Sequence, residues 1–270
     1  MELSEPCFIL VLKGDNLDAD VRKALIDSGV PILCWAYDSL SRCPGQRSAM
    51  DISRHCFVMD GTDVEVVGKK AEWLPLGYDP EIYRPGKGNS RDIDVLFVGL
   101  LNSLYSARRR YLKTLEGSYL TRRYRCVLVG TTGTRVGDRI IRVPRGVDWL
   151  AKRLPERELG ALVARSKICV NIHQDDGGMP VNPMFFAIPG AGACQVAEKR
   201  PYLSRWLTPF EHYIPADEDG LEDALVDLLE HDVRRNSVSR ASHEIARNAH
   251  TYFHRIDMML ARLSRSNPHP

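Results

Sequence analysis

The sequence lacks the marks of several classes of protein. No apolar run approaches the roughly 18 residues that a membrane-spanning helix requires. The N-terminus MELSEPCFIL has neither the basic start nor the small-residue cleavage site of a signal peptide. Of the 270 residues, 44% are hydrophobic and 27% are charged, which is ordinary for a globular protein. We therefore do not expect a disordered chain, a collagen-like chain or a membrane-spanning chain.

Close cysteine pairs are also missing. The seven cysteines form no CxxC motif, and several lie within apolar runs such as CFILVL and KICVNI, where a free thiol packs as a small hydrophobic group. An odd number of cysteines without close pairs argues against a disulfide framework and against a zinc site. We therefore predict a reducing compartment, the cytoplasm.

Several catalytic motifs are absent. Without GxGxxG or GxxxxGK[ST], the sequence gives little support to an NAD enzyme or a P-loop NTPase. Without GxSxG or HExxH, it gives none to a hydrolase. His173, Asp175 and Asp176 match no defined metal-binding spacing, so we expect no metal site. Few aromatic residues accompany the arginines, so a stacking surface for single-stranded nucleic acid is not indicated.

The sequence does contain an alternation of apolar runs and helical patterns. In the first third, apolar runs predict strands at 7–13, 31–37, 55–59 and 72–74, and a helical pattern covers 18–28. Runs that are apolar on both faces and separated by helices are typical of a parallel sheet covered on both sides.

The densest cluster of proline and glycine, PLGYDPEIYRPGKGNS, occupies residues 75–90 and has the composition of a domain boundary. Beyond it the alternation begins again. Strands are predicted at 93–99, 126–130, 168–173 and 192–196, and helices at 108–115, 155–166, 185–192, 221–230 and 237–263.

The predicted fold class is therefore α/β, with two Rossmann-like, doubly wound domains. We place a short first domain at residues 1–84 and a fuller second domain at 85–270. Two such domains would face each other across a cleft between the carboxyl ends of their sheets, where ligands of open α/β sheets bind.

Two of the predicted strands end in glycine, Gly99 after FV and Gly130 after LV. A turn from strand through glycine to helix leaves backbone N–H groups free to hold a phosphate. A tight turn also requires glycine, so a purely structural role explains each residue equally well.

Polar residues lie at the carboxyl ends of other predicted strands. Asp38 closes PILCWAYD, and Asn171 and His173 end ICVNIH. Asp38 is our candidate for a general base and His173 is the second choice. The alternative for both is a local role, in which the side chain caps the following turn or loop.

The formal charge of +2 conceals an uneven distribution. Residues 108–125 contain seven basic side chains and one acid, Glu116, and residues 135–157 contain seven more basic side chains. Such clusters are most often solvated helix faces. Beside a strand–glycine loop they can also neutralise a diphosphate, and a broad cluster can bind nucleic acid.

Six segments also occur in a familiar order. They are FILVLKGDNLDADVRKALIDSGVPILCWAYDS, WLPLGYDPEIYRP, DVLFVGLLNSLYSARRRYLKTL, ARSKICVNIH, NPMFFAIPGAGACQV and AHTYFHRIDMML. Together they resemble the CgeB-like (spore maturation protein) glycosyltransferases, a GT-B-fold group related to the glycosyl-transferase-1 families. The resemblance covers most of the chain.

The resemblance implies a hexosyltransferase-type enzyme that needs no catalytic metal and no cofactor. The second domain would bind a nucleotide sugar, linked to UDP, GDP or TDP, and the first domain would bind the acceptor. The acceptor is open: a small molecule, a glycan, a protein or a nucleic acid. From the resemblance and the strand–glycine turns, the donor-binding candidates are Gly99, Asn102, Arg108, Gly130, Asn171, Asn182, Phe186, Gly192 and Glu211.

Two positions depart from the family pattern "R.FE", in which the Arg and the Glu are expected to hold the donor. Here these positions are Met184 and Ala187. Neighbours such as Asn182 and Arg108 would then take over, or the donor preference has changed, or activity is lost. The alternatives are therefore a catalytically silent protein that binds a nucleotide or a partner, and a glycosyltransferase acting on nucleic acid.

The short first domain is a further departure from the CgeB-like family, whose typical members have a longer first domain. An acceptor domain with few strands would be open, suited to a large acceptor, or completed by a partner chain, including a second copy in a homo-oligomer.

Overall fold

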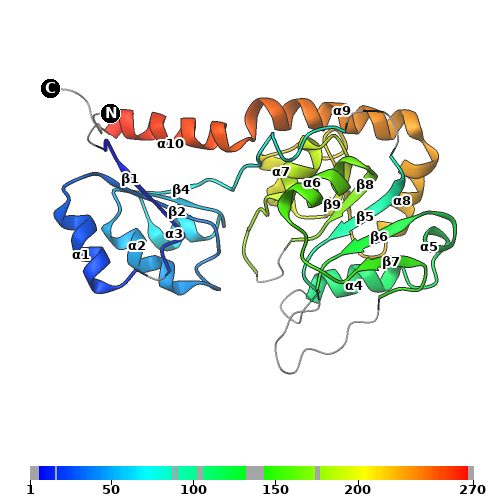
Figure 1. Cartoon of the computed structure of the whole chain (residues 1–270), viewed down its shortest axis with the longest axis horizontal. Helices are drawn as coiled ribbons and strands as arrows, with labels where there is room; N and C mark the ends of the chain where they lie inside the picture. The colour runs from blue at the N-terminus through cyan, green and yellow to red at the C-terminus, as the bar shows by residue number, and fades with distance from the viewer. Residues whose placement is uncertain are drawn as a thin grey trace. The chain divides into compact units, whose positions relative to one another are not determined.

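The computed structural model describes residues 6–15, 17–86, 88, 91–101, 106–131, 143–173 and 177–266. The chain divides into two compact units (Figure 1). Unit 1 comprises residues 1–76 and 176–182, and unit 2 comprises 77–175 and 183–270. The division falls inside the proline- and glycine-rich segment, a few residues before the expected boundary at 84/85. The return of 176–182 to unit 1 was not expected from the sequence.

Unit 1 is built on a four-stranded parallel sheet in the order β1-β2-β3-β4. The strands lie within or next to the predicted apolar runs: β1 (Ile9–Leu12), β2 (Ile32–Ala36), β3 (His55–Val58) and β4 (Ala71–Trp73). The connections contain α1 (Ala19–Asp27), a 3-10 turn (Pro44–Gln46), α2 (Arg47–Ile52) and α3 (Asp63–Val67).

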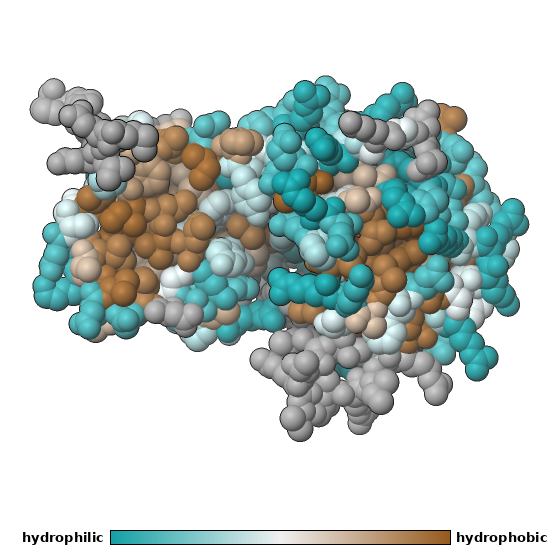
Figure 2. All heavy atoms as spheres, viewed as in Figure 1, coloured by the Kyte–Doolittle hydropathy of each residue, from teal (hydrophilic) through white to brown (hydrophobic). Residues whose placement is uncertain are grey.

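The core of unit 1 sits on β2, whose residues are all buried. The indole N–H of Trp35 donates to the carbonyl of Leu74 at 3.0 Å, which ties β2 to the residue after β4. The edge strand β1 is less covered, with Leu12 55% exposed. Figure 2 shows hydrophobic residues gathered on the viewed face of this unit.

The returning segment of unit 1 is held by the buried carboxylate of Asp60. Asp60 Oδ1 accepts hydrogen bonds from the backbone N–H of Met179 at 2.8 Å, the N–H of Thr62 at 3.0 Å and the hydroxyl of Thr62 at 2.7 Å. Position 178 has to be glycine, because a Cβ there would lie 2.1 Å from Asp60 Oδ2. These contacts make the returning segment part of unit 1 although it is remote in sequence.

Unit 2 contains a six-stranded parallel sheet in the order β10-β9-β8-β5-β6-β7. The strands are β5 (Ile93–Val98), β6 (Cys126–Val129), β7 (Val147–Leu150), β8 (Ser166–Asn171), β9 (Cys194–Glu198) and β10 (Ile214–Ala216). The chain proceeds from β5 outward to β7, then crosses back to β8 and proceeds outward on the other side. The strand order therefore reverses between β5 and β8.

Helices cover both faces of this sheet. The helices of unit 2 are α4 (Ser106–Thr114), α5 (Tyr119–Arg123), α6 (Glu156–Ala164), α7 (Met184–Gly190), α8 (Leu221–Glu230), α9 (Asp232–Ala249) and α10 (Tyr252–Ser266), with a 3-10 turn at Pro201–Arg205. Apolar residues of α4, α5 and α8 pack with β5 and β6 in one core cluster. The α7 helix contacts α6, α9 and the strands β8 and β9, while α6 contacts β8 and α9 contacts β9. This arrangement confirms the predicted α/β, Rossmann-like fold class.

The predicted continuous helix over 237–263 was wrong, because α9 ends at Ala249 and α10 begins at Tyr252. At the break, the backbone N–H of Tyr78 donates to the carbonyl of His250 at 3.2 Å, and the N–H of Tyr252 donates to the carbonyl of Tyr78 at 3.1 Å. This strand-like pairing uses backbone groups that a continuous helix would have paired internally.

A buried cation stabilises the same junction. Arg255 is 1% exposed, and its guanidinium lies 5.1 Å from the ring centre of Phe186 and 5.8 Å from that of Trp206. It donates to the Ala249 carbonyl at 3.1 Å and contacts Nδ1 of His250 at 3.0 Å. The His250 ring stacks on Phe186 at 4.4 Å. Burial, and next the charge of Arg255, lower the pKa of His250 from 6.5 to about 3.

This lowered pKa predicts a loss of stability in acid. Below about pH 6.5 the unfolded chain protonates His250 whereas the folded chain does not, so the free energy of unfolding falls until pH 3. Between about pH 7.5 and about pH 5 this residue should cost about 2 kcal/mol. Urea unfolding at the two pH values checks this, since His250→Asn should reduce the difference by about that amount.

The control is Phe253→Asn, because Phe253 is 70% exposed on the neighbouring helix α10 and carries no ionisable group. It should leave the pH dependence unchanged. Burial also lowers the pKa of His173, so a smaller dependence of the same sign remains in His250→Asn. If the free energy of unfolding of His250→Asn depends on pH as strongly as that of the unaltered protein, His250 has the same pKa in the folded and unfolded chains, and the prediction is wrong.

Candidate functional site

The point where the strand order of unit 2 reverses lies between the carboxyl ends of β5 and β8. In doubly wound sheets the crevice at this point is where ligands bind. Gly99 follows β5 directly, and Ile172 and His173 follow β8. The structure therefore brings two of the predicted site residues, Gly99 and His173, to one edge of the sheet.

The Arg108 side chain, from the first turn of α4, connects the two loops at this crevice. Its Nε donates to the Ile172 carbonyl at 3.1 Å, and its Nη1 donates to the Leu100 carbonyl at 3.1 Å. A Cβ at position 99 would lie 2.9 Å from Arg108 Nη1, so the glycine leaves room for the guanidinium. Arg108 thus brings positive charge to the predicted place and also holds the loops together.

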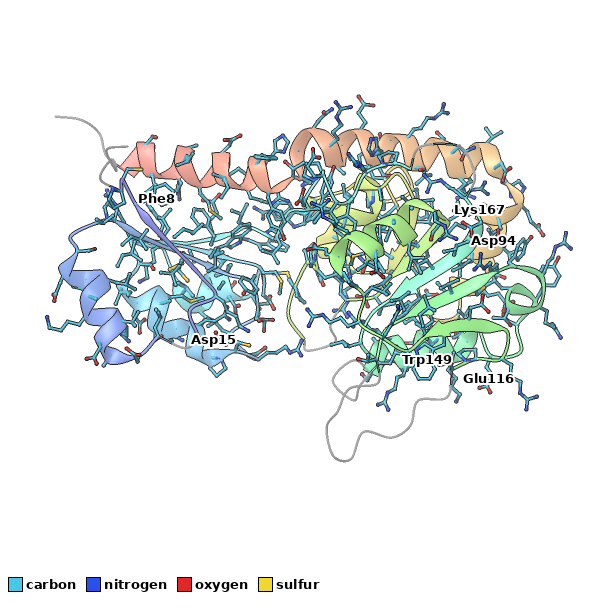
Figure 3. All side chains as sticks on the ribbon, in the orientation of Figure 1. Phe8, Asp15, Asp94, Glu116, Trp149 and Lys167 are labelled. Carbon is cyan, nitrogen blue, oxygen red and sulfur yellow. The ribbon has the colours of Figure 1, made fainter. Side chains whose placement is uncertain are left out.

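Gly130 follows β6 and packs directly against Gly99. Its φ is +156°, and a Cβ there would lie 1.9 Å from the carbonyl oxygen of Gly99. The indole N–H of Trp149 on β7 donates to the Gly130 carbonyl at 3.0 Å, and Figure 3 labels this side chain. Glycine is thus required at position 130 by the close approach of two backbone segments, whatever ligand lies above them.

A hollow of about 700 Å³ opens at these strand ends, which we call the carboxyl-edge hollow. Its lining comes from the strand ends, from the segment before α6 and from the start of α7: Tyr83, Val98, Gly99, Leu100, Val129, Gly130, Thr131, Lys152, Arg153, Leu154, Pro155, Glu156, Leu159, Pro183 and Met184. The volume is typical of small-molecule sites.

Two cations line this hollow, Lys152 and Arg153. Both side chains are exposed, and neither forms a hydrogen bond or an ion pair with a residue that the structure describes, although the backbone N–H of Lys152 donates to the Leu150 carbonyl at 2.8 Å. Cations without an internal partner are available to an anionic ligand, and Arg and Lys are the side chains that proteins use for phosphate groups. The sequence placed both residues in a basic segment but did not assign them to the site.

His173 lies inside unit 2 rather than in the carboxyl-edge hollow. It is 1% exposed, and its Nδ1 is 3.1 Å from Glu198 Oε1. Its backbone N–H donates to the same oxygen at 2.6 Å, and Arg200 Nε is 3.0 Å from it. Burial lowers the pKa of His173, although Glu198 acts in the opposite direction. An acceptor cannot reach this imidazole without a rearrangement, which weakens its assignment as a base.

Four further candidates do not line this hollow. Asn171 is buried, and its amide donates to Gln195 Oε1 at 3.4 Å. Phe186 is fully buried in the cluster around Arg255. Gly192 precedes β9 and therefore lies at the opposite, amino-terminal edge of the sheet. Glu211 is exposed before β10 and lies 3.7 Å from His212 Nε2.

The remaining donor candidates fall elsewhere. Asn182 belongs to the returning segment of unit 1. Asn102 lies outside the described residues, as do Asp175 and Asp176. Among the residues that the structure describes, no three His, Cys, Asp or Glu side chains gather as a metal site would require. No described helix is long and apolar enough to cross a membrane.

Asp38 follows β2 in unit 1 and forms an ion pair. Its Oδ2 lies 3.0 Å from Lys13 Nζ, and Asp15, labelled in Figure 3, lies 3.4 Å from the same ammonium. Lys13 has the left-handed φ of +64°, which is uncommon outside glycine and often marks functional sites. Hydrogen bonding and the charge of Asp38 raise the pKa of Lys13, so the ammonium is charged at neutral pH.

A family model described as "Glycosyl transferase-like" matches residues 108–261, more than half of the chain. The chain belongs to this family. The match begins at Arg108, beside the crevice, and extends into α10. No curated protein sequence matches the chain.

Solved structures resemble this glycosyl transferase-like chain in fold. HepE of Anabaena, in complex with UDP-glucose, is 14% identical with a TM-score of 0.66, over 91% of this chain and 75% of that chain. Sucrose-phosphate synthase of Thermosynechococcus elongatus is 13% identical with a TM-score of 0.64, over 88% and 68%. An α-glucosyltransferase in complex with UDP-glucose and DNA is 9% identical with a TM-score of 0.66, over 96% and 80%. The GT-B fold that the sequence predicted is thereby confirmed.

The backbone contact between Gly99 and Gly130 yields a test of the site's construction. We expect Gly130→Ala to lower the free energy of unfolding by about 2 kcal/mol or more, since the new Cβ collides with backbone and the φ is strained. Urea unfolding measures this. Gly86→Ala is the control, because a Cβ there meets only Ala164 at 3.9 Å. Equal stability of the two variants would contradict the steric requirement.

Proposed function

We propose that this chain transfers a sugar from a nucleotide-sugar donor to an acceptor hydroxyl or similar group, with the donor diphosphate in the carboxyl-edge hollow. The observation that carries the proposal is a hollow at the point where the strand order reverses, lined by two cations whose side chains have no partner among the described residues. The cations supply charge opposite to that of a diphosphate. The backbone N–H groups of Gly99 and Gly130 do not hold the phosphate as the sequence predicted, because they donate to the carbonyls of Val129 at 3.0 Å and Leu150 at 3.2 Å. Membership of the glycosyl transferase-like family supports the reaction class.

The solved neighbours support a UDP-linked donor as the first choice. HepE was solved with UDP-glucose, and a trehalose-phosphate synthase of Burkholderia vietnamiensis is described as UDP-forming. A UDP-hexose is therefore our leading donor, with GDP- and TDP-linked sugars as the alternatives.

In the proposed mechanism, Lys152 and Arg153 stabilise the negative charge that develops on the departing diphosphate. This charge stabilisation is the work that a divalent cation does in other transferases, so we propose a metal-independent reaction. Arg108 adds a fixed positive charge below the crevice while it holds the loops of β5 and β8 in place.

The two departures from the family pattern have different surroundings. Met184 lines the carboxyl-edge hollow, whereas Ala187 is 1% exposed within unit 2. The positive charge missing at position 184 is supplied in the same hollow by residues 152 and 153. This replacement favours an active transferase over a catalytically silent protein.

On the acceptor side we propose Asp38 as the general base of an inverting reaction. Its Oδ2 lies 3.0 Å from the ammonium of Lys13, which orients the carboxylate just after the carboxyl end of β2, as the geometry of a general base requires. We also propose that the chain belongs to the CgeB-like group and acts in the cytoplasm. The six matching segments support the first assignment, and seven free thiols support the second.

The nucleic-acid acceptor has less support, because arginines of the basic segment are engaged within the chain. Arg110 lies 2.7 Å from Glu218, and Arg125 lies 2.7 Å from Asp92. The Arg123 guanidinium lies 5.5 Å from the ring centre of Tyr119. Charges already neutralised or covered by side chains contribute less to phosphate binding.

Donor binding is tested with a double variant, Lys152→Gln with Arg153→Gln. UDP or UDP-glucose at about 100 times its dissociation constant should stabilise the unaltered protein by about 2.7 kcal/mol. Loss of two charged contacts should weaken binding at least about tenfold. Thermal-shift titration with UDP, GDP and TDP and their sugars measures both effects.

The matched control removes two charges nearby, Arg145→Gln with Arg157→Gln. Both arginines are exposed and neither lines the carboxyl-edge hollow. Equal weakening in the control would assign the effect to long-range charge. The absence of stabilisation by every nucleotide would overturn the proposed function in favour of a silent protein.

The base is tested with Asp38→Asn. We expect hydrolysis of the donor, in which the sugar passes to water and the nucleoside diphosphate is released, to fall about 100-fold or more while the donor-induced thermal shift is retained. Asp15→Asn is the matched control, because Asp15 contacts the same ammonium. Full activity of Asp38→Asn would contradict the assignment, and an equal loss in both variants would assign the effect to the ion-pair cluster.

A further inference from the structure

A second hollow lies at the opposite edge of the unit 2 sheet, and we call it the amino-edge hollow. It measures about 540 Å³ and lies between α9 and the residues that precede β5 and β9. The strands between the two edges are up to six residues long, which separates the hollows by about 20 Å. The proposed transfer reaction therefore does not account for this feature.

Arg91 lies in this hollow as a cation without a carboxylate partner among the described residues. Its Nη1 donates to the Ser166 carbonyl at 2.5 Å and its Nη2 to the Gly192 carbonyl at 2.6 Å. The adjacent Asp92 carboxylate is bound by other arginines, including Arg165 at 2.8 Å. Burial lowers the pKa of Arg91, as expected for a desolvated charge that neighbouring carboxylates do not offset.

The residues of α9 that line the hollow are polar apart from Val233. Asn236, Ser239, Arg240 and His243 line it at the spacing i, i+3, i+4 and i+7, which places side chains on one helix face. Figure 2 shows hydrophilic residues along α9. Polar residues on a face that encloses a hollow point to a polar occupant.

The polar groups on this helix face have a defined arrangement. The Ser239 hydroxyl donates to the Gly192 carbonyl, which also accepts from Arg91. His243 Nδ1 donates to the Pro189 carbonyl at 3.0 Å, which fixes the ring, and Nε2 of the neutral imidazole is then an acceptor. The Arg240 guanidinium is exposed and has no hydrogen bond or ion pair among the described residues.

No described residue lining the amino-edge hollow is acidic. The acid in the first turn of α9, Asp232, lies 2.6 Å from Arg235 and is thus neutralised. Gly192 adds no side chain to the hollow, and a Cβ at this position would lie 3.2 Å from Arg91 Nη2.

We propose that the amino-edge hollow binds a small anion that carries a phosphate or diphosphate group, held by Arg91 and Arg240. The several N–H donors of two guanidinium groups can bind the several oxygens of a phosphate or diphosphate.

The test uses inorganic pyrophosphate as the probe, at constant ionic strength, with amide resonances of the full chain followed by NMR. We expect saturable shifts at Gly192 and Ser239, and Arg240→Gln should weaken the affinity at least about tenfold. Arg247→Gln is the matched control, because it removes the same charge from the same helix outside the hollow. Its affinity should equal that of the unaltered protein.

The double variant Lys152→Gln with Arg153→Gln separates this proposal from the proposed donor site. Pyrophosphate shifts at Gly192 and Ser239 should persist in it, whatever its effect on nucleotide binding. Shifts that disappear in this variant, that weaken equally in Arg247→Gln, or that are absent in the unaltered protein would each overturn the proposal. Retained affinity in Arg240→Gln would overturn it as well.

Discussion

The candidate site of unit 2 depends on one interaction, the bridge that Arg108 forms between the loops after β5 and β8. These loops flank the point where the strand order reverses, and nothing in a parallel sheet itself connects them beyond the strand ends. The guanidinium satisfies a carbonyl on each side and fixes their separation. Gly99 has no side chain because the guanidinium occupies that space, and Gly130 packs on Gly99 in turn. The shape of the carboxyl-edge hollow follows from this chain of contacts.

Two other places show polar contacts fixing parts of the chain that are remote in sequence. Asp60 holds the returning segment of unit 1 through the backbone N–H of Met179. Tyr78 pairs with the backbone on both sides of Thr251 and thereby separates α9 from α10. In each case a buried polar group needs a hydrogen-bond partner. The contact therefore fixes one arrangement of the two chain segments, whereas apolar packing alone would permit several. The HTYFHR segment, quoted above for its family resemblance, contains the residues of the second junction.

The parallel sheets were predictable because their strands are buried on both faces and therefore read as continuous apolar runs. The outer strand β7 was missed for the opposite reason, because it is largely exposed. The outer strand β10 was missed because its three residues, Ile-Pro-Ala, include a proline, which argues against a strand. The break between α9 and α10 was missed because the periodicity of 237–263 is helical throughout. Asp38, Gly99 and Gly130 were chosen as candidates because each directly follows, or nearly follows, an apolar strand. Lys152 and Arg153 carried no signal beyond their charge.

The sequence by itself determined the α/β class, the segment that contains the unit boundary and the strand ends that carry polar or glycine residues, because these depend on local periodicity and composition. Only the tertiary structure decided which of those residues meet. It placed His173 against Glu198 in the interior, Phe186 against Arg255, and Gly192 at the opposite edge from Gly99. Such placements depend on contacts between residues distant along the chain, and periodicity holds no information about them.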